Sequence, residues 1–365
     1  PRYEWPITLN HMIYHVSGLR DYLNLFPLSG RSDYYPISRR QILEMMSRQR
    51  ALVFPPGEQY QYSNTAYMLL AGVVERASGQ SLGTFMHERI FTPLGMEGTY
   101  LYDNFEEIMP HRATGYSREA DGKVRMVHNY NFDVVGDGQM YSTMEDLLTW
   151  NNHLLGREKP DYYSIMMQEG TLNDGTATRR AKGLFLDEYR GLETIHHTGG
   201  SWGTLSVIKR FVEPGLAIAI ACNDQNSYPR RLAFRVADHF LAEQLGPKPR
   251  ESDSGSDTEA ETKPEAPSLS AVELAEFAGD FFSEELDATY RLALVEDRLM
   301  LRIEQEPPTG IDPVAQDRFE FGFHPQGWGG PSTVTLEFNR DPAGIVAGFG
   351  LSSGSEQGIE FEKHE

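Results

Sequence analysis

Residues 246–270, with the sequence GPKPRESDSGSDTEAETKPEAPSLS, divide the chain into two parts. This segment is rich in Pro, Ser, Glu and Asp and nearly free of large apolar residues, so it cannot bury a core of its own. The chain of 365 residues also exceeds the usual size of one domain. We therefore expect a large domain over residues 1–246, an acidic linker over 247–270 and a small domain over 271–365.

Hydrophobic patterns predict both helices and strands in the large domain. After Asn64, apolar residues in TAYMLLAGVVERASG recur at helical spacing up to Gly79, which predicts a buried helix directly after Tyr62 and Ser63. From Lys182 onward, short apolar runs such as TLSVIKRFV and LAIAIAC predict antiparallel strands, and nearly every run after the linker is also strand-like. The predicted fold is therefore α+β: an antiparallel sheet flanked by helices, with an all-α region, followed by a small all-β domain that forms a barrel or a sheet.

Charge and cysteine content limit the classes of partner. The 53 acidic and 33 basic residues give a formal net charge of −20, which disfavours binding to nucleic acid or to anionic membranes. No apolar run is long enough to cross a bilayer. The single cysteine, Cys222, lies in a run typical of a buried strand, so no internal disulfide can form and a catalytic thiol is not expected. The composition does not indicate which small-molecule or peptide substrate would bind.

The stretch HHTGGSWGTLSVIK, residues 196–209, contains two patterns typical of a serine nucleophile. Ser201 lies in a G-x-S-x-G pattern, which requires a helix directly after the serine, whereas here a predicted strand follows. Ser206 and Lys209 form an S-x-x-K pattern, which places both side chains on one face only in a helix. On the predicted strand they point to opposite faces, so we expect neither serine to be a nucleophile.

The same stretch contains a His-Thr-Gly triplet at residues 197–199. It follows a Tyr-Ser-Asn motif at residues 62–64, within FPPGEQYQYSNTAYMLLAGVVERASGQSL, and a later segment, GDGQMYSTMEDLLTW. In this order, with LNHMIYHVSGLRDY upstream, residues 7–223 resemble the serine β-lactamase and penicillin-binding-protein superfamily, specifically its class C-like branch of esterases, D-peptidases and β-lactamase-related proteins. The C-terminal part is similar to the small β-domain often attached to such proteins.

The resemblance implies roles for the residues of the Tyr-Ser-Asn motif. Tyr62 would share the general-base role and accept the serine proton during acylation. This role requires a neighbouring cation, because the ordinary pKa of tyrosine is about 10. Asn64 would hold a lysine and the substrate amide or ester by hydrogen bonds, a task suited to its donor and acceptor groups.

The resemblance also implies roles for the triplet and the residue after it. His197 and Thr198 would orient the tyrosine and bind the polar end of the substrate. Gly199 would let the backbone approach the ligand closely, and Gly200 would offer its backbone N–H to the oxyanion hole. No metal or organic cofactor is expected, because acylation needs only a serine, a base and an oxyanion hole.

Each of these residues also has a purely structural interpretation. Tyr62 could be a packed aromatic, Asn64 a helix cap and His197 a turn residue beside a sheet. His11 and His15, four residues apart on an expected helix, have a spacing that could hold a metal. No third ligand pattern lies nearby, so we expect a packing role for both histidines and no metal site.

In the family that the chain resembles, an S-x-x-K motif lies several tens of residues before the Y-x-N motif. This chain begins too late to contain it, so we expect the nucleophilic serine and its lysine to be absent and the first domain to be N-terminally incomplete. The resemblance implies a serine hydrolase that acts through an acyl-enzyme on an ester, a D-amino-acid amide or a β-lactam. His197 in place of lysine favours esterase or D-peptidase activity over efficient β-lactamase activity.

The alternative is a non-catalytic binding or cell-envelope interaction protein that uses the remnant cleft. We favour the hydrolase, because both motifs present are complete and a cleft used only for binding would not need a base-type tyrosine. The resemblance suggests a periplasmic or secreted protein and leaves the cytoplasm open. The sequence does not indicate an oligomeric state.

Overall fold

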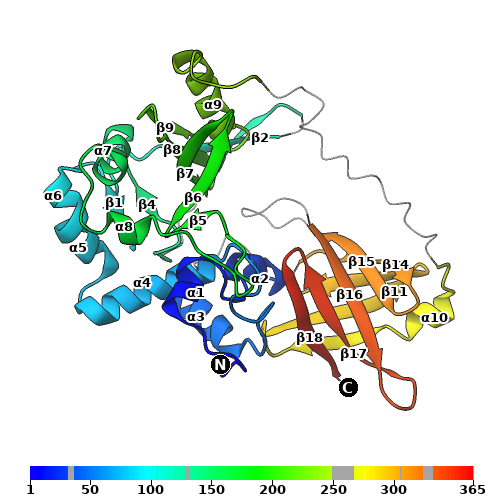
Figure 1. Cartoon of the computed structure of the whole chain (residues 1–365). Coiled ribbons are helices and arrows are strands. Elements are labelled where there is room, and N and C mark those ends of the chain that lie inside the picture. The colour runs from blue at the N-terminus through cyan, green and yellow to red at the C-terminus, as the bar shows by residue number, and fades with distance from the viewer. Residues whose placement is uncertain are drawn as a thin grey trace.

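The structure is a computed structural model of the chain. The residues that it describes are 1–31, 37–104, 106–119, 121–127, 132–248, 267–304, 306–323 and 332–364. Most of the expected linker, residues 249–266, lies outside the described residues. On either side of it the chain forms a mixed region of helices and sheet and a β-barrel (Figure 1). The α+β fold with a small all-β part is therefore confirmed.

The first half of the mixed region is mainly helical, as predicted. Its helices are α1 (Leu9–Ile13), α2 (Tyr22–Leu28), α3 (Arg39–Arg48), α4 (Asn64–Ser78), α5 (Leu82–Met86), the π-helical turn η1 (His87–Phe91) and α6 (Thr92–Leu94). Two small antiparallel pairs follow, β1 (Tyr100–Leu101) with β4 (Met140–Tyr141) and β2 (Gly115–Arg118) with β3 (Val124–Val127). The later helices are α7 (Met144–Leu155), α8 (Tyr163–Met166) and α9 (Pro229–Phe240).

Helix α4 begins and ends as its sequence predicts. The Ser63 hydroxyl accepts a hydrogen bond from the backbone N–H of Ala66 at 3.2 Å and caps the first turn. Gly79 ends the helix in the left-handed region, at φ 71°, which glycine adopts without steric cost. The cap is thus Ser63, and the structural interpretation of Asn64 as the cap is wrong.

The sheet of the mixed region contains β5 (Arg180–Ala181), β6 (Leu184–Tyr189), β7 (Leu192–Ser201), β8 (Thr204–Phe211) and β9 (Ala217–Cys222). These strands are antiparallel neighbours in chain order, as the turn-separated apolar runs predict. Helix α9 packs on the face that carries Val207 and Phe211. Helix α7 packs on the opposite face, where Leu154 and Leu155 meet Ile195.

The C-terminal barrel begins with α10 (Ala271–Ala275) and continues as one antiparallel sheet. Its strands are β10 (Gly279–Ser283), β11 (Ala288–Val295), β12 (Arg298–Ile303), β13 (Thr309–Gly310), β14 (Asp312–Ala315), β15 (Arg318–Phe323), β16 (Ser332–Arg340), β17 (Val346–Ser353) and β18 (Glu356–His364). The order in the sheet is β13-β12-β11-β10-β18-β17-β16-β15-β14. Only Ile311 separates the edge strands β13 and β14 along the chain, so the sheet is nearly closed.

The barrel and the helical region share one apolar core. Tyr22 and Leu25 of α2 belong to the same buried cluster as Tyr290, Ile303 and Phe349 of the barrel. The Tyr290 hydroxyl donates to the backbone carbonyl of Leu28, at the end of α2, at 2.8 Å. Figure 1 shows α2 next to β18, between the barrel and the rest of the helical region. This shared core fixes the barrel against the segment that leads into α2.

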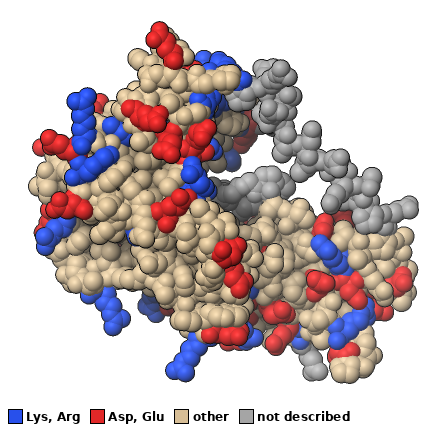
Figure 2. Space-filling view, in the orientation of Figure 1, with Lys and Arg blue, Asp and Glu red and all other residues tan. Residues whose placement is uncertain are grey.

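The charges on the surface and the character of the helices are those expected from the composition. Acidic and basic side chains are interspersed over the face shown in Figure 2. Among the described residues, no helix combines the length and the apolar character needed to cross a membrane. Cys222 lies at the end of β9, is partly buried and is a free thiol.

Candidate active site

Tyr62 lies where the chain enters α4, and its side chain is 37% exposed. The centroid of its ring is 6.4 Å from that of His197 on β7 and 6.5 Å from that of Phe185 on β6. The rings of Phe185 and His197 meet edge-on at 5.2 Å. Two motifs that are far apart in the sequence therefore meet, and we call Tyr62, Asn64 and His197 the tyrosine site.

The ring of His15 forms the support on which Tyr62 lies. It stacks on Tyr62 at a centroid distance of 4.2 Å and on Tyr67 at 4.8 Å. Its Nδ1 accepts a hydrogen bond from the backbone N–H of Ser63 at 3.0 Å. Burial lowers the pKa of His15 to about 4, and the nearby charges of His197 and Arg180 act in the same direction. His15 is therefore neutral at pH 7, as its role of hydrogen-bond acceptor requires.

The side chain of Asn64 is oriented by Asp21, the N-cap of α2. The backbone N–H and the Nδ2 of Asn64 both donate to Asp21 Oδ2, each at 2.8 Å. Because a carboxylate only accepts hydrogen bonds, the amide of Asn64 must turn Nδ2 toward Asp21 and Oδ1 away from it. This orientation suits Oδ1 for accepting a hydrogen bond from an ammonium group or from a substrate N–H.

Acidic groups surround the tyrosine site. The Tyr22 hydroxyl donates to Asp137 Oδ2 at 2.5 Å, and Asp137 Oδ1 is buried without a hydrogen-bond partner among the described residues. Burial raises the pKa of Asp137 to about 7, and the charge of Asp21 acts in the same direction. Burial also raises the pKa of Tyr62 above its ordinary value, and Tyr67, Asp137 and Asp21 act in the same direction. Tyr62 is therefore a neutral phenol in this environment.

The triplet lies at the C-terminal end of β7, where only part of it faces Tyr62. Burial lowers the pKa of His197, and its Nδ1 lies 2.7 Å from the backbone oxygen of Thr198, so the neutral ring donates through Nδ1. Side chains alternate along a strand, so Thr198 points to the sheet face opposite to that of His197. The structure thus brings His197 to Tyr62 and turns the side chain of Thr198 away.

Gly199 and Gly200 lie on a stretch of β7 that pairs with β8 on one side and, among the described residues, with no strand on the other. The pairing of β6 with β7 ends at Phe185 and His196, whereas β8 stays paired to the end of β7. Backbone N–H groups that point away from β8 in residues 197–200 therefore have no strand partner on that side among the described residues. A Cβ on Gly199 would lie 2.5 Å from the Ser206 hydroxyl, which would have to rotate away to admit a larger residue.

Neither serine pattern has the helical setting that its motif requires. Ser201 ends β7, and a turn at Gly203, with φ 72°, leads into β8 rather than into a helix. Ser206 pairs with Gly199 and Lys209 pairs with His196, so the two side chains lie on opposite faces of β8. Lys209 is 0% exposed and donates to the Thr194 hydroxyl at 3.1 Å. The predictions that a strand, not a helix, follows Ser201 and that Ser206 and Lys209 lie on a strand are confirmed.

The two N-terminal histidines do not share a helix. Helix α1 ends at Ile13, and His15 follows it with φ 57°, so the expectation that one helix carries both is wrong. His11 Nδ1 accepts a hydrogen bond from the backbone N–H of Thr8 in a capping box. Within the described part of the chain, no group of His, Cys, Asp and Glu side chains has the arrangement of a metal site.

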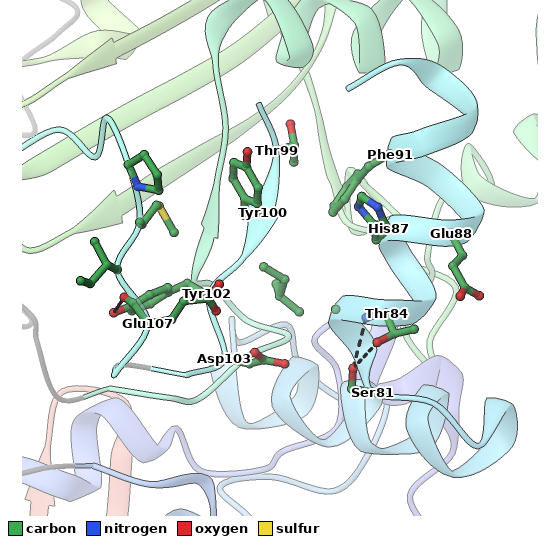
Figure 3. Close-up of a pocket in the computed structure, with 15 residues that line it drawn as sticks. Ser81, Thr84, His87, Glu88, Phe91, Thr99, Tyr100, Tyr102, Asp103 and Glu107 are labelled. Carbon is green, nitrogen blue, oxygen red and sulfur yellow. Dashed lines mark hydrogen bonds between the residues drawn. The ribbon is translucent and has the colours of Figure 1, made fainter. Parts of the chain in front are cut away.

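Two cavities lie near these elements. One, of about 630 Å³, is bordered by the triplet end of β7 and by the first turn of α9. The other, of about 380 Å³, lies between α5, η1 and β1 (Figure 3). Its lining includes Ser81, His87, Phe91, Tyr100 and Tyr102. Figure 3 shows the hydrogen bonds between Ser81 and Thr84. No predicted site residue lines the second cavity, so we do not assign an activity to it.

The sequence did not identify Asp21, Tyr22 and Asp137 as residues of this region, and it predicted only a packing role for His15, which also accepts a hydrogen bond from the Ser63 backbone. All four lie in segments that carry the family resemblance, LNHMIYHVSGLRDY and GDGQMYSTMEDLLTW. Their polar character, inside segments that carry the resemblance, was the signal by which the sequence could have identified them. Their contacts join positions more than 40 residues apart, as in the bond from Tyr22 to Asp137, and no local pattern predicts such pairs.

Comparison with families and curated proteins identifies relatives of the mixed region. Residues 1–241 match the family model described as Beta-lactamase. A penicillin-binding protein of Bacillus subtilis (strain 168) is 26% identical over 254 residues, which are 64% of this chain and 55% of that protein. A D-aminopeptidase of Gluconobacter oxydans (strain 621H) is 26% identical over 239 residues, which are 65% of this chain and 44% of that protein. The chain spans about half the length of these curated relatives.

Solved structures show the same fold. An octameric penicillin-binding protein homologue from Pyrococcus abyssi has a TM-score of 0.57 at 18% identity, and the match covers 98% of this chain and 78% of that one. A D-amino acid amidase from Ochrobactrum anthropi has a TM-score of 0.52 at 23% identity, over 65% of this chain and 73% of that one. The first match extends over the barrel, whereas the second has the length of the mixed region.

Proposed function

The chain belongs to the Beta-lactamase family, and on this premise we propose that the tyrosine site is the acyl-transfer site of a serine hydrolase. The observation that supports this most directly is the approach of the Tyr62 and His197 rings to 6.4 Å, with Asn64 held beside Tyr62 by Asp21. A general base, an amide and a backbone edge that has no strand partner beyond β8 among the described residues then surround the position of the reacting carbonyl.

Tyr62 needs a cation before it can act as a base. Its acidic neighbours favour the neutral phenol, whereas a lysine ammonium beside it would favour the phenolate. The sequence contains S-x-x-K only at Ser206, on a strand, with Lys209 buried on the other face. We infer that the nucleophilic serine and its lysine come from outside these 365 residues and complete the site between Tyr62 and Asn64.

The proposed reaction follows from these groups. The serine Oγ attacks the substrate carbonyl carbon and passes its proton to the Tyr62 phenolate. The tetrahedral intermediate then expels the amine or alkoxide, which takes that proton from Tyr62 and leaves an acyl-serine. Water attacks the acyl-serine, loses a proton to Tyr62, and the released serine oxygen takes that proton back. Backbone N–H groups of the serine and of Gly200 stabilise the oxyanion in both steps.

The proposed substrates are esters and amides of D-amino acids. D-aminopeptidases among the relatives support this class. His197, whose pKa is lowered by burial, supplies no fixed positive charge at neutral pH for the carboxylate of a β-lactam. We therefore expect weak β-lactamase activity.

Turnover of D-alanine p-nitroanilide tests this proposal, with its L-enantiomer and nitrocefin as comparisons. A longer form of the protein that carries the S-x-x-K segment should hydrolyse the D-anilide preferentially. Tyr62→Phe should lower kcat by about 100-fold or more, whereas Tyr60→Phe, in the same loop, should not. Equal rates for both enantiomers, or an unchanged kcat in Tyr62→Phe, would contradict the proposal.

A non-catalytic binding protein is the second candidate function. The occurrence of S-x-x-K only on strand β8 favours it, because the chain itself then carries no paired serine and lysine. This alternative predicts saturable binding of D-alanine amide by calorimetry without turnover in any longer form. Hydrolysis by the longer form would exclude it.

A further inference from the structure

We propose that the C-terminal barrel positions the side chain of Asn64, and that Glu285 and Glu356 are the positioning residues through which it acts. The barrel holds the segment at Arg20 and Asp21, which leads into α2, and Asp21 holds Asn64. The inference rests on the proposed function only in the role of Asn64, because the contacts themselves are independent of any reaction.

The link nearest to the site is the carboxylate of Asp21, which is 4% exposed. Its Oδ2 accepts both hydrogen bonds from Asn64, and its Oδ1 accepts one from the backbone N–H of Leu23 at 2.9 Å. The carboxylate cannot rotate without breaking the cap of α2 or the bonds to Asn64. The position of the Asp21 backbone therefore sets the position of the Asn64 amide.

The barrel fixes that backbone through Arg20, which is 1% exposed. Arg20 Nη1 donates to Glu285 Oε1 at 2.8 Å, and Nη2 donates to the backbone carbonyls of Gln357 at 2.8 Å and Gly358 at 3.0 Å. Glu285 lies in the turn between β10 and β11, and the other two residues begin β18. One guanidinium therefore joins two separate parts of the barrel rim to the residue before Asp21.

A second contact reaches Asp21 itself. Glu356 Oε1 accepts a hydrogen bond from the backbone N–H of Asp21 at 3.2 Å and another from Asn24 Nδ2 at 3.0 Å. Glu356 is 0% exposed, and its bond to the Asp21 backbone is buried, whereas the bond to Asn24 lies nearer the surface. Burial raises the pKa of Glu356 to about 6, so the group is still mainly ionised at pH 7, and its carboxylate oxygen accepts both hydrogen bonds.

Hydrogen–deuterium exchange at the Asn64 backbone amide tests this relay, because that amide donates to Asp21 Oδ2 and its protection needs no turnover. Glu356→Ala in the full chain should speed exchange at Asn64 by about tenfold or more, the equivalent of one lost hydrogen bond. Amides of β11 should change by less than about twofold. Glu356→Gln keeps the acceptor oxygen and should restore protection at Asn64.

Two further variants make the test decisive. Glu360→Ala removes an exposed glutamate from the same strand and should leave Asn64 unchanged. Glu356→Asp withdraws the acceptor by one methylene and gives a milder change if Glu356→Ala does not fold. Unchanged protection at Asn64 in Glu356→Ala and Glu356→Asp, or equal acceleration in β11, would overturn the proposal. A chain without hydrolase activity would still show the predicted pattern, so the failure of one proposal is distinguishable from that of the other.

Discussion

The imidazole of His15 lies stacked on the phenol of Tyr62, with ring centroids 4.2 Å apart and planes 27° apart. The same imidazole accepts the backbone N–H of Ser63, the residue between Tyr62 and Asn64. His15 thus fixes both the ring and the backbone of the Tyr-Ser-Asn motif. Its neutral form is required for the hydrogen bond, and its burial beside Tyr67 maintains that form.

His15→Ala should lower the free energy of unfolding by about 2–4 kcal/mol, because it removes two stacked contacts and leaves the Ser63 N–H without its acceptor. Urea unfolding followed by fluorescence measures this. His11→Ala is the matched control, since it removes only a capping contact and should cost about 1 kcal/mol or less. Equal losses in the two variants would show that His15 has no special structural role.

Asp137→Asn should make the protein more stable at pH 8 and about equally stable at pH 4. The folded pKa of Asp137 is raised from 3.8 to about 7, so its protonated form stabilises the fold below pH 4 and that contribution is lost as the pH rises through 7. The difference at pH 8 should be about 2–4 kcal/mol. Unfolding curves at both pH values measure it, and a difference that does not depend on pH would show that ionisation of Asp137 is not its cause.

Glu285→Ala should destabilise the chain far more than Glu284→Ala does. Glu285 and Arg20 form an ion pair with side chains 3% and 1% exposed, and removing one partner of a buried pair costs about 3–5 kcal/mol. Glu284 pairs with Arg50 at the surface, where such a pair contributes about 1 kcal/mol or less. Comparable unfolding midpoints for the two variants would show that the contact between Glu285 of the barrel and Arg20 is weak.

Local sequence patterns predicted the elements that carry the site. The helix that starts at Asn64 and ends at Gly79, and the strand assignment of the segment with Ser206 and Lys209, follow from the spacing of apolar residues and are confirmed. The two-residue period of a strand places Ser206 and Lys209 on opposite faces, and the strand after Ser201 does not fit a nucleophile elbow. The alternative interpretation of Asn64 as the cap of α4 is wrong; Ser63 and Asn64 are equally good capping residues, and only backbone geometry separates them.

The partners of the site could not be predicted from the sequence. Asp21, Asp137 and Glu356 are polar residues that acquire their roles from contacts with distant segments, such as the bond from the Asp21 backbone to Glu356 on β18. Local patterns carry no signal for such contacts. The end of α1 before His15 was also missed, because its C-terminal turn, closed by the hydrogen bond from the backbone N–H of Val16 to the carbonyl of His11 at 2.9 Å, places a histidine rather than the usual glycine in the left-handed region.

Labelling with a fluorophosphonate, read out by intact mass and peptide mapping, tests most directly whether Tyr62 serves a serine from outside these 365 residues. The chain of 365 residues should stay unlabelled at Ser201 and Ser206. A longer form with the S-x-x-K segment should gain one adduct on its additional serine. The Tyr62→Phe variant of that form should be labelled at a rate lower by about 100-fold or more. An adduct on Ser201 or Ser206, or labelling of the longer form at full speed in Tyr62→Phe, would contradict the assignment of the tyrosine site.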